Sequence, residues 1–338
     1  MIEYACFSKS MTILRKRGLS LCVSQMNLRE KMSAKVWVLG DAVVDLLPES
    51  DGRLLPCPGG APANVAVGIA RLGGTSGFIG RVGDDPFGAL MQRTLLTEGV
   101  DITYLKQDEW RPDIHGACRS ERSRRTFIYV YGPPQCRSFL ETTDLPCWRH
   151  GEWLHLCSIA LSAEPSRTSA FTAMTAIRHA GGFVSFDPNI REDLWQDEHL
   201  LRLCLRQALQ LADVVKLSEE EWRLISGKTQ NDRDICALAK DYEIAMLLVT
   251  KGAEGVVVCY RGQVHHFAGM SVNCVDSTGA GDAFVAGLLT GLSSSGLSTD
   301  EREMRRIIDL AQRCGALAVT AKGAMTALPC RQELESEK

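Results

Sequence analysis

The stretch VDSTGAGDAF at residues 275–284 decides the fold class of this chain and indicates its chemistry. Two glycines and small residues stand immediately before Asp282, and the apolar run at 283–289 that follows predicts a buried helix. Backbone N–H groups at a helix start have no intrahelical partner, and the helix dipole adds partial positive charge there. The stretch therefore predicts a site for an anion such as phosphate.

Asp282 lies beside this predicted site, where its negative charge would repel a phosphate. One interpretation is that its carboxylate accepts the proton of an alcohol that attacks phosphorus. The other is that it is only a helix-start carboxylate, which the helix dipole stabilises. The stretch alone leaves both interpretations open.

The composition is that of an ordinary globular protein, with 338 residues, 45% hydrophobic and 23% charged. Such a chain can bury a large core in one large α/β domain or two smaller ones. The net charge of −3 gives no reason to expect nucleic acid or a membrane surface as a partner. The thirteen cysteines form no C-x-x-C pair or zinc-type cluster, which favours a reducing cytoplasm over a disulfide framework.

Strand and helix patterns alternate along the chain. Strands are predicted at 35–39, 77–82, 153–156, 183–187, 214–217, 246–250 and 256–260, and helices at 64–72, 85–99, 167–180, 200–211 and 232–241, with a loop at 291–298. This order predicts a doubly wound α/β fold, with a mostly parallel sheet and helices on both faces. Ligands on such sheets bind beyond the carboxyl ends of the strands.

A second group of polar residues occurs near the N-terminus. Asp41 and Asp45 flank a short apolar link, Gly59 and Gly60 allow close approach of the backbone to a ligand, and Asn64 opens a helix. Carboxylates and an amide can bind sugar hydroxyls, since together they offer acceptors and a donor. A plain turn followed by a helix N-cap explains the same residues equally well.

Taken together, these motifs resemble those of a known family. From about residue 35 to 329 the chain is similar to the ribokinase-like (PfkB) sugar kinases, on the motifs GGAPAN at 59–64, GRVGDDPFG at 80–88 and DSTGAGDAF at 276–284. Within the family it resembles bacterial fructokinases of sucrose-utilisation systems, with aminoimidazole riboside kinase as a near relative. The resemblance implies the doubly wound fold with a small β-stranded lid.

The resemblance also implies roles for the matching residues. Asp282 would take the proton from the primary hydroxyl of the sugar, and the N–H groups of Gly279, Ala280 and Gly281 would form an anion hole for the transferred phosphoryl group. The residues expected to hold the sugar are Asp45, Gly60 and Asn64, with Asp41 as a helper. Arg191 would reach the substrate or the phosphates.

On the nucleotide side, the resemblance implies ATP, Mg²⁺ and K⁺ as cofactors. The residues expected near ATP are Lys216, Ser218, Glu221, Thr250, Gly252 and Gly255; Ser218 stands where many members have asparagine, and Glu221 would help to organise magnesium. The potassium ion is expected near Asp276 and Thr278, with carbonyl groups of Ala318, Ala321 and Gly323.

The domain organisation follows from the same comparison. Residues 1–31 are expected to be an extension that folding does not need, 32–332 the kinase domain and 333–338 a tail. The lid is expected from about 45–58 and 105–138, and the resemblance implies a homodimer through it. Residues 111–137, however, are rich in arginine and lack the expected alternating strands, which led us to hypothesise a short out-of-frame stretch there.

The sequence thus predicts an ATP-dependent kinase that converts D-fructose to D-fructose 6-phosphate. Two alternatives stay open. In the first, the substrate is aminoimidazole riboside or another furanoside. In the second, the chain is a catalytically impaired sugar-binding relative because of its altered lid.

Overall fold

The computed structural model of the chain describes residues 33–48, 51, 53–109, 115–121, 124–130 and 139–336, so the predicted extension 1–31 lies outside the described residues. The strands are β1 (Val36–Leu39), β2 (Val43–Pro48), β3 (Leu54–Gly59), β4 (Ser76–Gly83), β5 (Asp101–Asp108), β6 (His115–Glu121), β7 (Arg124–Val130), β8 (Trp153–Cys157), β9 (Phe183–Asp187), β10 (Val214–Ser218), β11 (Met246–Thr250), β12 (Gly255–Tyr260) and β13 (Gln263–Ala268). The helices are α1 (Ala61–Arg71), α2 (Pro86–Thr97), α3 (Ser166–His179), α4 (Glu198–Leu211), α5 (Glu219–Ser226), α6 (Asp232–Asp241), α7 (Ala280–Ser295), α8 (Glu301–Ala318) and α9 (Arg331–Ser336). The predicted alternation of strands and helices is confirmed.

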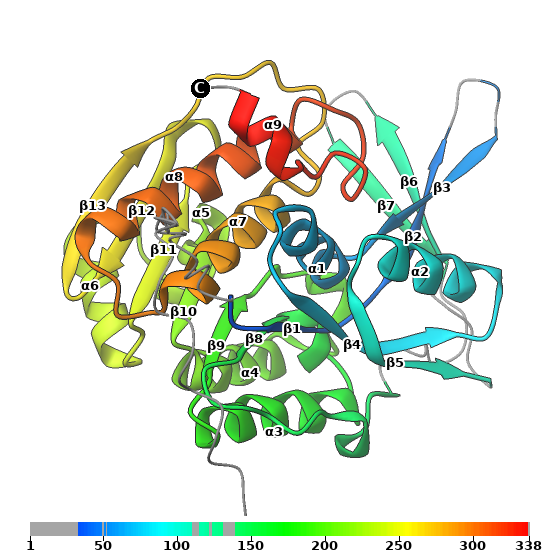
Figure 1. Cartoon of the computed structure of the whole chain (residues 1–338), viewed down its shortest axis with the longest axis horizontal. Helices are drawn as coiled ribbons and strands as arrows, with labels where there is room; N and C mark the ends of the chain where they lie inside the picture. The colour runs from blue at the N-terminus through cyan, green and yellow to red at the C-terminus, as the bar shows by residue number, and fades with distance from the viewer. Residues whose placement is uncertain are drawn as a thin grey trace, which may run out of the picture. The chain divides into compact units, whose positions relative to one another are not determined.

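Nine strands form the main sheet, in the order β13-β12-β11-β10-β9-β8-β1-β4-β5 (Figure 1). Every pair from β11 to β5 is parallel, and β12 and β13 add an antiparallel edge. The predicted doubly wound, mostly parallel sheet is therefore confirmed. Since parallel strands end at one edge of the sheet, their carboxyl ends gather residues far apart in sequence.

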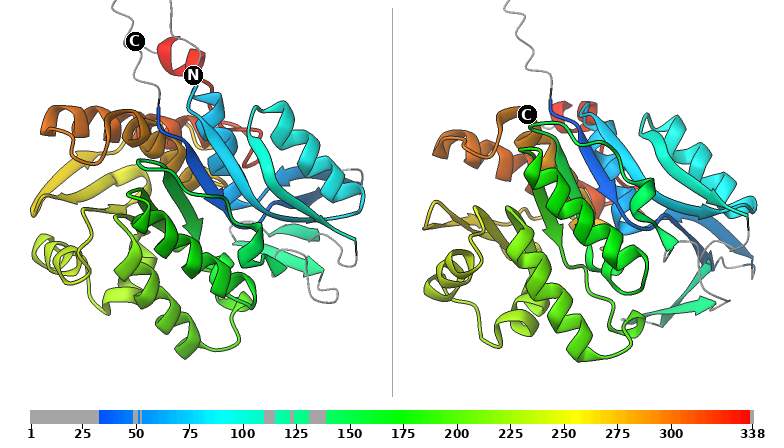
Figure 2. Two further views of the ribbon diagram at one scale, coloured as in Figure 1. Left: turned by 60° about the horizontal axis from the view of Figure 1, so that its bottom comes forward. Right: turned by 90° about the horizontal axis from the view of Figure 1, so that it is seen from below.

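Helices cover both faces of this sheet, because successive strand residues point to opposite sides. Val36 and Val38 join one core with α1, α7 and α8, whereas Trp37 and Leu39 join the other with α3 and α4. Figure 2 shows α3 and α4 in green on one side of the strands and α7 and α8 in orange on the other. The sheet is thus buried on both faces, as its nearly continuous apolar strands require.

The loop predicted at 291–298 is only partly right, because α7 continues to Ser295 and only residues 296–298 lie in the loop before α8. Glycines of α7 serve helix packing. A Cβ on Gly287 would lie 2.9 Å from the Cα of Ala311, and one on Gly291 would lie 2.8 Å from the Ile307 side chain. Only glycine lets α8 approach α7 this closely, so Gly287 and Gly291 reflect tight packing, whereas Gly296, with a φ of +80°, ends the helix.

A second, four-stranded sheet has the order β3-β2-β6-β7, at the place of the expected lid. One boundary needs correction, because residues 105–108 belong to β5 in the main sheet. The segment 111–137, from whose sequence the expected alternating strands are missing, nevertheless contributes β6 and β7, which pair from His115 to Val130. Strand pairing uses backbone groups, so it does not require the side-chain alternation that the sequence lacks there.

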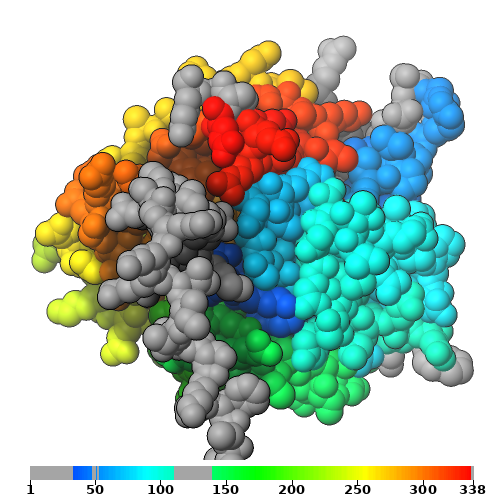
Figure 3. Space-filling model, in the orientation of Figure 1, coloured from blue at the N-terminus to red at the C-terminus, as the bar shows by residue number. Residues whose placement is uncertain are grey.

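The predicted tail from 333 is also wrong, because α9 carries Leu334 into the core, where it is 5% exposed. The segment before α9 is tied to α1, since the Arg71 guanidinium donates to the carbonyl oxygens of Met325 (3.0 Å) and Leu328 (2.8 Å). Figure 3 shows this red segment against the blue α1 region. Within the part of the chain that the structure describes, no helix is both long and apolar enough to cross a membrane.

Candidate active site

Polar residues line the carboxyl-terminal edge of the main sheet. Thr250 pairs with Ser218 at the ends of β11 and β10, and Asp187 pairs with Cys157 at the ends of β9 and β8. Asp41 follows β1, the next strand along, and is 6% exposed. The topology therefore places residues from five strands in a row along one edge.

The two signature motifs meet at this edge through one hydrogen bond. The Asn64 amide in α1 donates to a carboxylate oxygen of Asp282 in α7 over 2.8 Å, although 218 positions separate them in sequence. The start of α1 lies close to Asp41, because Gly60 has a φ of +97° and a Cβ there would be 2.7 Å from the Asp41 carbonyl oxygen. Both features bring the predicted sugar-side residues to the predicted base.

The Asp282 carboxyl is held in an unusual electrostatic environment. Its pKa is raised from 3.8 to about 6 as a net effect: burial is the main cause of the rise and the charge of Asp187 adds to it, while the hydrogen bond from Asn64 and the charges of Lys216 and Arg191 oppose it. A carboxyl with a pKa near 6 is ionised at neutral pH and is a stronger base than an ordinary aspartate. These properties suit a general base.

Lys216 supplies the buried positive charge of the cluster. Its Nζ lies 2.9 Å from a carboxylate oxygen of Asp187, and both residues are at most 9% exposed. Burial alone would lower the pKa of Lys216, but the charges of Asp187 and then Glu221 raise it above its usual value. Lys216 therefore stays charged beside the start of α7, where a Cβ on Gly281 would be 3.3 Å from its Nζ.

On the sugar side, burial raises the pKa of Asp45 to about 6; the charge of Asp41 adds to this rise and that of Arg191 opposes it. Gly59 lies against this carboxylate, since a Cβ there would be 2.6 Å from an Asp45 oxygen. Arg191 is exposed, and its guanidinium donates to the carbonyl oxygen of Ile190 (3.0 Å). Asp41, Asp45 and Arg191 are therefore close enough to influence one another's charge.

The start of α7 has the geometry that the glycines predicted. Gly279 is the N-cap with a φ of +80°, and a Cβ there would be 2.9 Å from the Cα of Ala324. The Ala280 N–H donates to the carbonyl oxygen of Ser277 over 3.4 Å, a long and weak bond that an anion can displace. The N–H groups of this turn can therefore serve an anion.

Asp276 joins the turn before α7 to the segment after α8. One of its carboxylate oxygens accepts from the Thr278 N–H (2.8 Å) and the other from the Gly323 N–H (3.0 Å). Ala318 is the last residue of α8, and Ala321 and Gly323 follow within five positions. Asp276 is buried and is bonded to the segment that follows the end of α8, where the last carbonyl groups of a helix lack intrahelical partners; carboxylate and carbonyl oxygens are ligands that suit a hard cation such as K⁺.

Glu221 and Ser218 form a capping box at the start of α5. The Glu221 carboxylate accepts from the Ser218 N–H (2.7 Å), and its other oxygen accepts from the Ile190 N–H (3.1 Å). Glu221 therefore fixes the loop after β9 against β10. This contact was not anticipated from the sequence, which assigned Glu221 to magnesium.

The glycine turn at the end of β11 is ordered by backbone geometry. Thr250 donates through Oγ1 to the Leu217 carbonyl oxygen (3.2 Å), and Gly252 and Gly255 have φ values of +55° and +109°. A Cβ on Gly255 would lie 2.0 Å from the Phe267 carbonyl oxygen, so only glycine fits. The turn brings backbone groups to the same sheet edge as Ser218.

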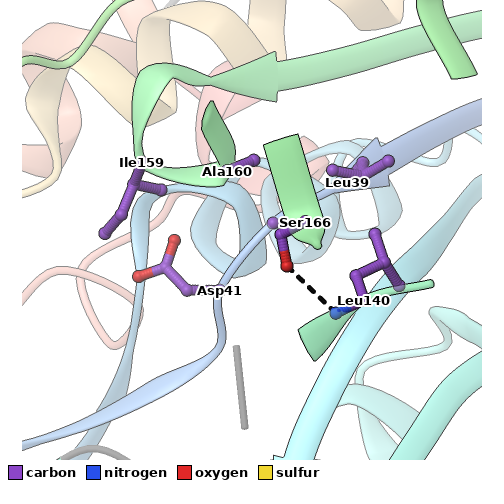
Figure 4. Close-up of a pocket in the computed structure, with 7 residues that line it drawn as sticks. Leu39, Asp41, Leu140, Ile159, Ala160 and Ser166 are labelled. Carbon is purple, nitrogen blue, oxygen red and sulfur yellow. Dashed lines mark hydrogen bonds between the residues drawn. The ribbon is translucent and has the colours of Figure 1, made fainter. Parts of the chain in front are cut away.

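Asp41 borders a small cavity of about 10 Å³, which Leu39, Leu140, Ile159 and Ser166 also line (Figure 4). The Leu140 N–H donates to Ser166 Oγ (3.0 Å), so α3 fixes residue 140, the second residue after the described chain resumes at 139. The cavity holds about one water molecule at most. It is a packing space beside the candidate site and not a ligand pocket.

This geometry agrees with comparisons with known proteins. The model of the pfkB family of carbohydrate kinases matches residues 33–331. The chain belongs to the pfkB family. A fructokinase of Escherichia coli is 91% identical over 308 residues, which cover 91% of this chain and 100% of the relative. An aminoimidazole riboside kinase of Salmonella typhimurium is 38% identical over 310 residues, 90% of this chain and 95% of the relative.

Solved structures of pfkB kinases share the fold. A double-mutant fructokinase of Vibrio cholerae O395, in a fructose, ADP and potassium ion bound form, has a TM-score of 0.85 and 44% identity, and covers 91% of this chain and 99% of its own. An aminoimidazole riboside kinase of Salmonella enterica, complexed with aminoimidazole riboside and an ATP analog, has a TM-score of 0.82 and 37% identity. The match covers 89% of this chain and 98% of the other.

Asp187 is a residue of this pfkB site that the sequence analysis did not select. It is the last residue of the predicted strand 183–187, and its pairing with Lys216 depends on the register of β9 and β10. An aspartate at the end of β9, next to the strand β10 that carries the buried Lys216, was the available signal. Among the described residues, no group of three or more His, Cys, Asp or Glu side chains could hold a metal by themselves.

Proposed function

We propose that this pfkB kinase transfers the γ-phosphoryl group of ATP to the primary hydroxyl of D-fructose, giving D-fructose 6-phosphate. The hydrogen bond between Asn64 and Asp282 is the single observation that carries this proposal, because it joins the sugar-side motif to the base and the helix start. The fructokinases at 91%, 56% and 55% identity support fructose as the substrate.

Asp282 acts as the base in this proposal. While Asn64 donates to one carboxylate oxygen, the other accepts the proton of the sugar hydroxyl as its oxygen attacks phosphorus. Asp41, Asp45 and Gly60 hold the remaining hydroxyls, together with Asn64. The ionised carboxylates accept hydrogen bonds from the sugar, and Gly60 lets the backbone come close.

The phosphoryl group is stabilised by the start of α7 and by two cations of the chain. The N–H groups of Gly279, Ala280 and Gly281 point at the developing negative charge, as the helix dipole favours. Lys216, which Asp187 keeps charged, approaches the phosphoryl group from the buried side, and Arg191 approaches it from the side exposed to solvent. Positioning and charge stabilisation are what phosphoryl transfer asks of a protein.

The residues of the nucleotide side have supporting roles. ATP lies along the edge formed by Ser218, Thr250, Gly252 and Gly255. Glu221 helps to organise magnesium and also fixes the loop after β9 through the Ile190 N–H. When bound, Mg²⁺ neutralises phosphate charge. Asp276, Thr278 and the carbonyl groups of Ala318, Ala321 and Gly323 would hold K⁺, which shapes the turn before α7 and takes no part in the chemistry.

We further propose a cytoplasmic enzyme of sucrose utilisation that dimerises through the second sheet. Described cysteines such as Cys157, Cys204 and Cys314 are free thiols, which fits a reducing compartment. On the edge strand β3, Leu54 and Leu55 are 49% and 47% exposed, which provides an apolar surface for a second copy.

An assay that couples ADP release to NADH oxidation, run over a panel of sugars, tests the substrate. We expect fructose to give the highest kcat/KM. Turnover of aminoimidazole riboside without turnover of fructose would reject the substrate and keep the kinase. Fructose binding by calorimetry without turnover of any sugar would support the impaired relative, whose altered segment 111–137 lies in the expected lid.

A further inference from the structure

Two cysteine side chains meet in the packing between α6 and β12. The Sγ atoms of Cys236 and Cys259 are 3.2 Å apart, and both residues are free thiols. Cys259 is 2% exposed, whereas Cys236 keeps part of its surface in solvent. The pair thus has one thiol that solvent can reach and one buried thiol in direct contact with it.

The packing around the pair holds the two sulfur atoms together. Ile235 and Ala239 bury the inner face of α6, and the Cys236 thiol donates to the Gly262 carbonyl oxygen over 3.6 Å. One turn earlier, Asp232 of α6 contacts His266 of β13 over 3.0 Å. Contacts on both strands of the β12–β13 hairpin therefore fix α6 over Cys259.

The pair is remote from the catalytic edge. Cys259 pairs with Leu247 near the start of β11, whereas Thr250 at the end of β11 pairs with Val256. The thiols therefore lie towards the opposite edge of the sheet, and the phosphoryl-transfer chemistry does not use them.

We propose that Cys236 and Cys259 form an oxidation site, in which a peroxide converts the thiol pair into an intramolecular disulfide that joins α6 to β12. The Cys236 thiolate attacks the peroxide, so that an S–O bond forms, the O–O bond breaks and the released oxygen leaves as water. The Cys259 sulfur then attacks the sulfenic sulfur, so that the S–S bond forms, the S–O bond breaks and a second water leaves with the Cys259 proton. The thiols lose two electrons and two protons in total, and hydrogen peroxide gains them.

The environment sets the order of these steps. Burial, followed by the contact with Cys236, raises the pKa of Cys259 to about 12, so this sulfur is a thiol and not a thiolate at neutral pH. Since thiolates react with peroxides and access is needed, the more exposed Cys236 reacts first and Cys259 resolves the sulfenic acid.

The test treats the full chain with a few equivalents of hydrogen peroxide, blocks remaining thiols with iodoacetamide and maps the peptides by mass spectrometry. We expect a peptide pair joined through Cys236 and Cys259, about 2 Da lighter than the two reduced peptides and separated by dithiothreitol. Because the disulfide closes a loop over 23 positions, the oxidised protein should unfold at a temperature higher by about 5 °C.

Cys236→Ser should abolish both the joined peptide and the rise in unfolding temperature, whereas Cys147→Ser, at an exposed cysteine, should keep both. Because Cys236 is only partly buried, this variant avoids opening a cavity at Cys259. The proposal is overturned if Cys236 and Cys259 are both alkylated after peroxide treatment, or if Cys236 proceeds to the sulfonic acid without linkage.

Discussion

Replacing Asp282 by asparagine should lower turnover strongly and make the protein more stable. The rise of the Asp282 pKa from 3.8 to about 6 means that its ionised form opposes folding by at most about 3 kcal/mol, at about 1.4 kcal/mol per pKa unit. Asparagine keeps the size of the side chain and can still accept the hydrogen bond from Asn64, but it carries no charge. The variant therefore loses this cost together with the base.

The pH dependence follows from the direction of the shift. Because the folded pKa lies above the unfolded one, the cost is absent at a pH well below 3.8, grows between 3.8 and 6, and is complete above 6. The variant should thus gain about 3 kcal/mol at pH 8 and about half of that at pH 5. For a folded unit of roughly 300 residues, the gain at pH 8 raises the unfolding temperature by about 5 °C.

Calorimetric unfolding at pH 5 and pH 8 measures the gain, and steady-state turnover of fructose measures the loss, which we expect to be about 10²–10⁴-fold or more in kcat. The reasoning fails if the variant turns over within tenfold of the parent. It fails equally if the variant is no more stable at pH 8, or if its gain is the same at both pH values.

Three further predictions follow from the same geometry. Asn64→Ala removes a hydrogen bond that lowers the Asp282 pKa, so the acid limb of the pH profile of kcat/KM should move above pH 6; an unmoved limb contradicts this. Gly279→Ala should lower kcat at least tenfold more than the matched control Gly281→Ala. A Cβ on Gly279 would lie 2.9 Å from the Cα of Ala324, whereas one on Gly281 would contact only the Nζ of Lys216, at 3.3 Å. Equal losses in the coupled assay would argue against the helix-start anion site. Arg81→Met removes the guanidinium that donates to the buried Asp144 carboxylate over 2.8 Å and 3.0 Å. It should lower the free energy of unfolding, measured with urea at pH 7, by about 3 kcal/mol, and a loss below about 1 kcal/mol would show that this ion pair is not structural.

Much of the fold could be predicted because its signals are local. Apolar runs located seven of the nine strands of the main sheet to within a few residues, as for β9 at Phe183–Asp187, but missed β5 and β13 at its two edges. The errors arose where composition had a non-local cause. Gly291 resembles a loop residue but lies in α7 because Ile307 packs against it, and Leu334 resembles part of a tail but is buried.

The sequence by itself determined the family and the chemical type of the site, because the motifs around Asn64 and Asp282 each encode a helix start with its polar residues in a fixed order. Only the tertiary structure decided how these groups act together. The strand order places Asp187 beside Lys216, and the packing of α1 and α7 directs the Asn64 amide to Asp282. A hydrogen bond or a charge interaction depends on distance in space, and the sequence specifies that distance only through the whole fold.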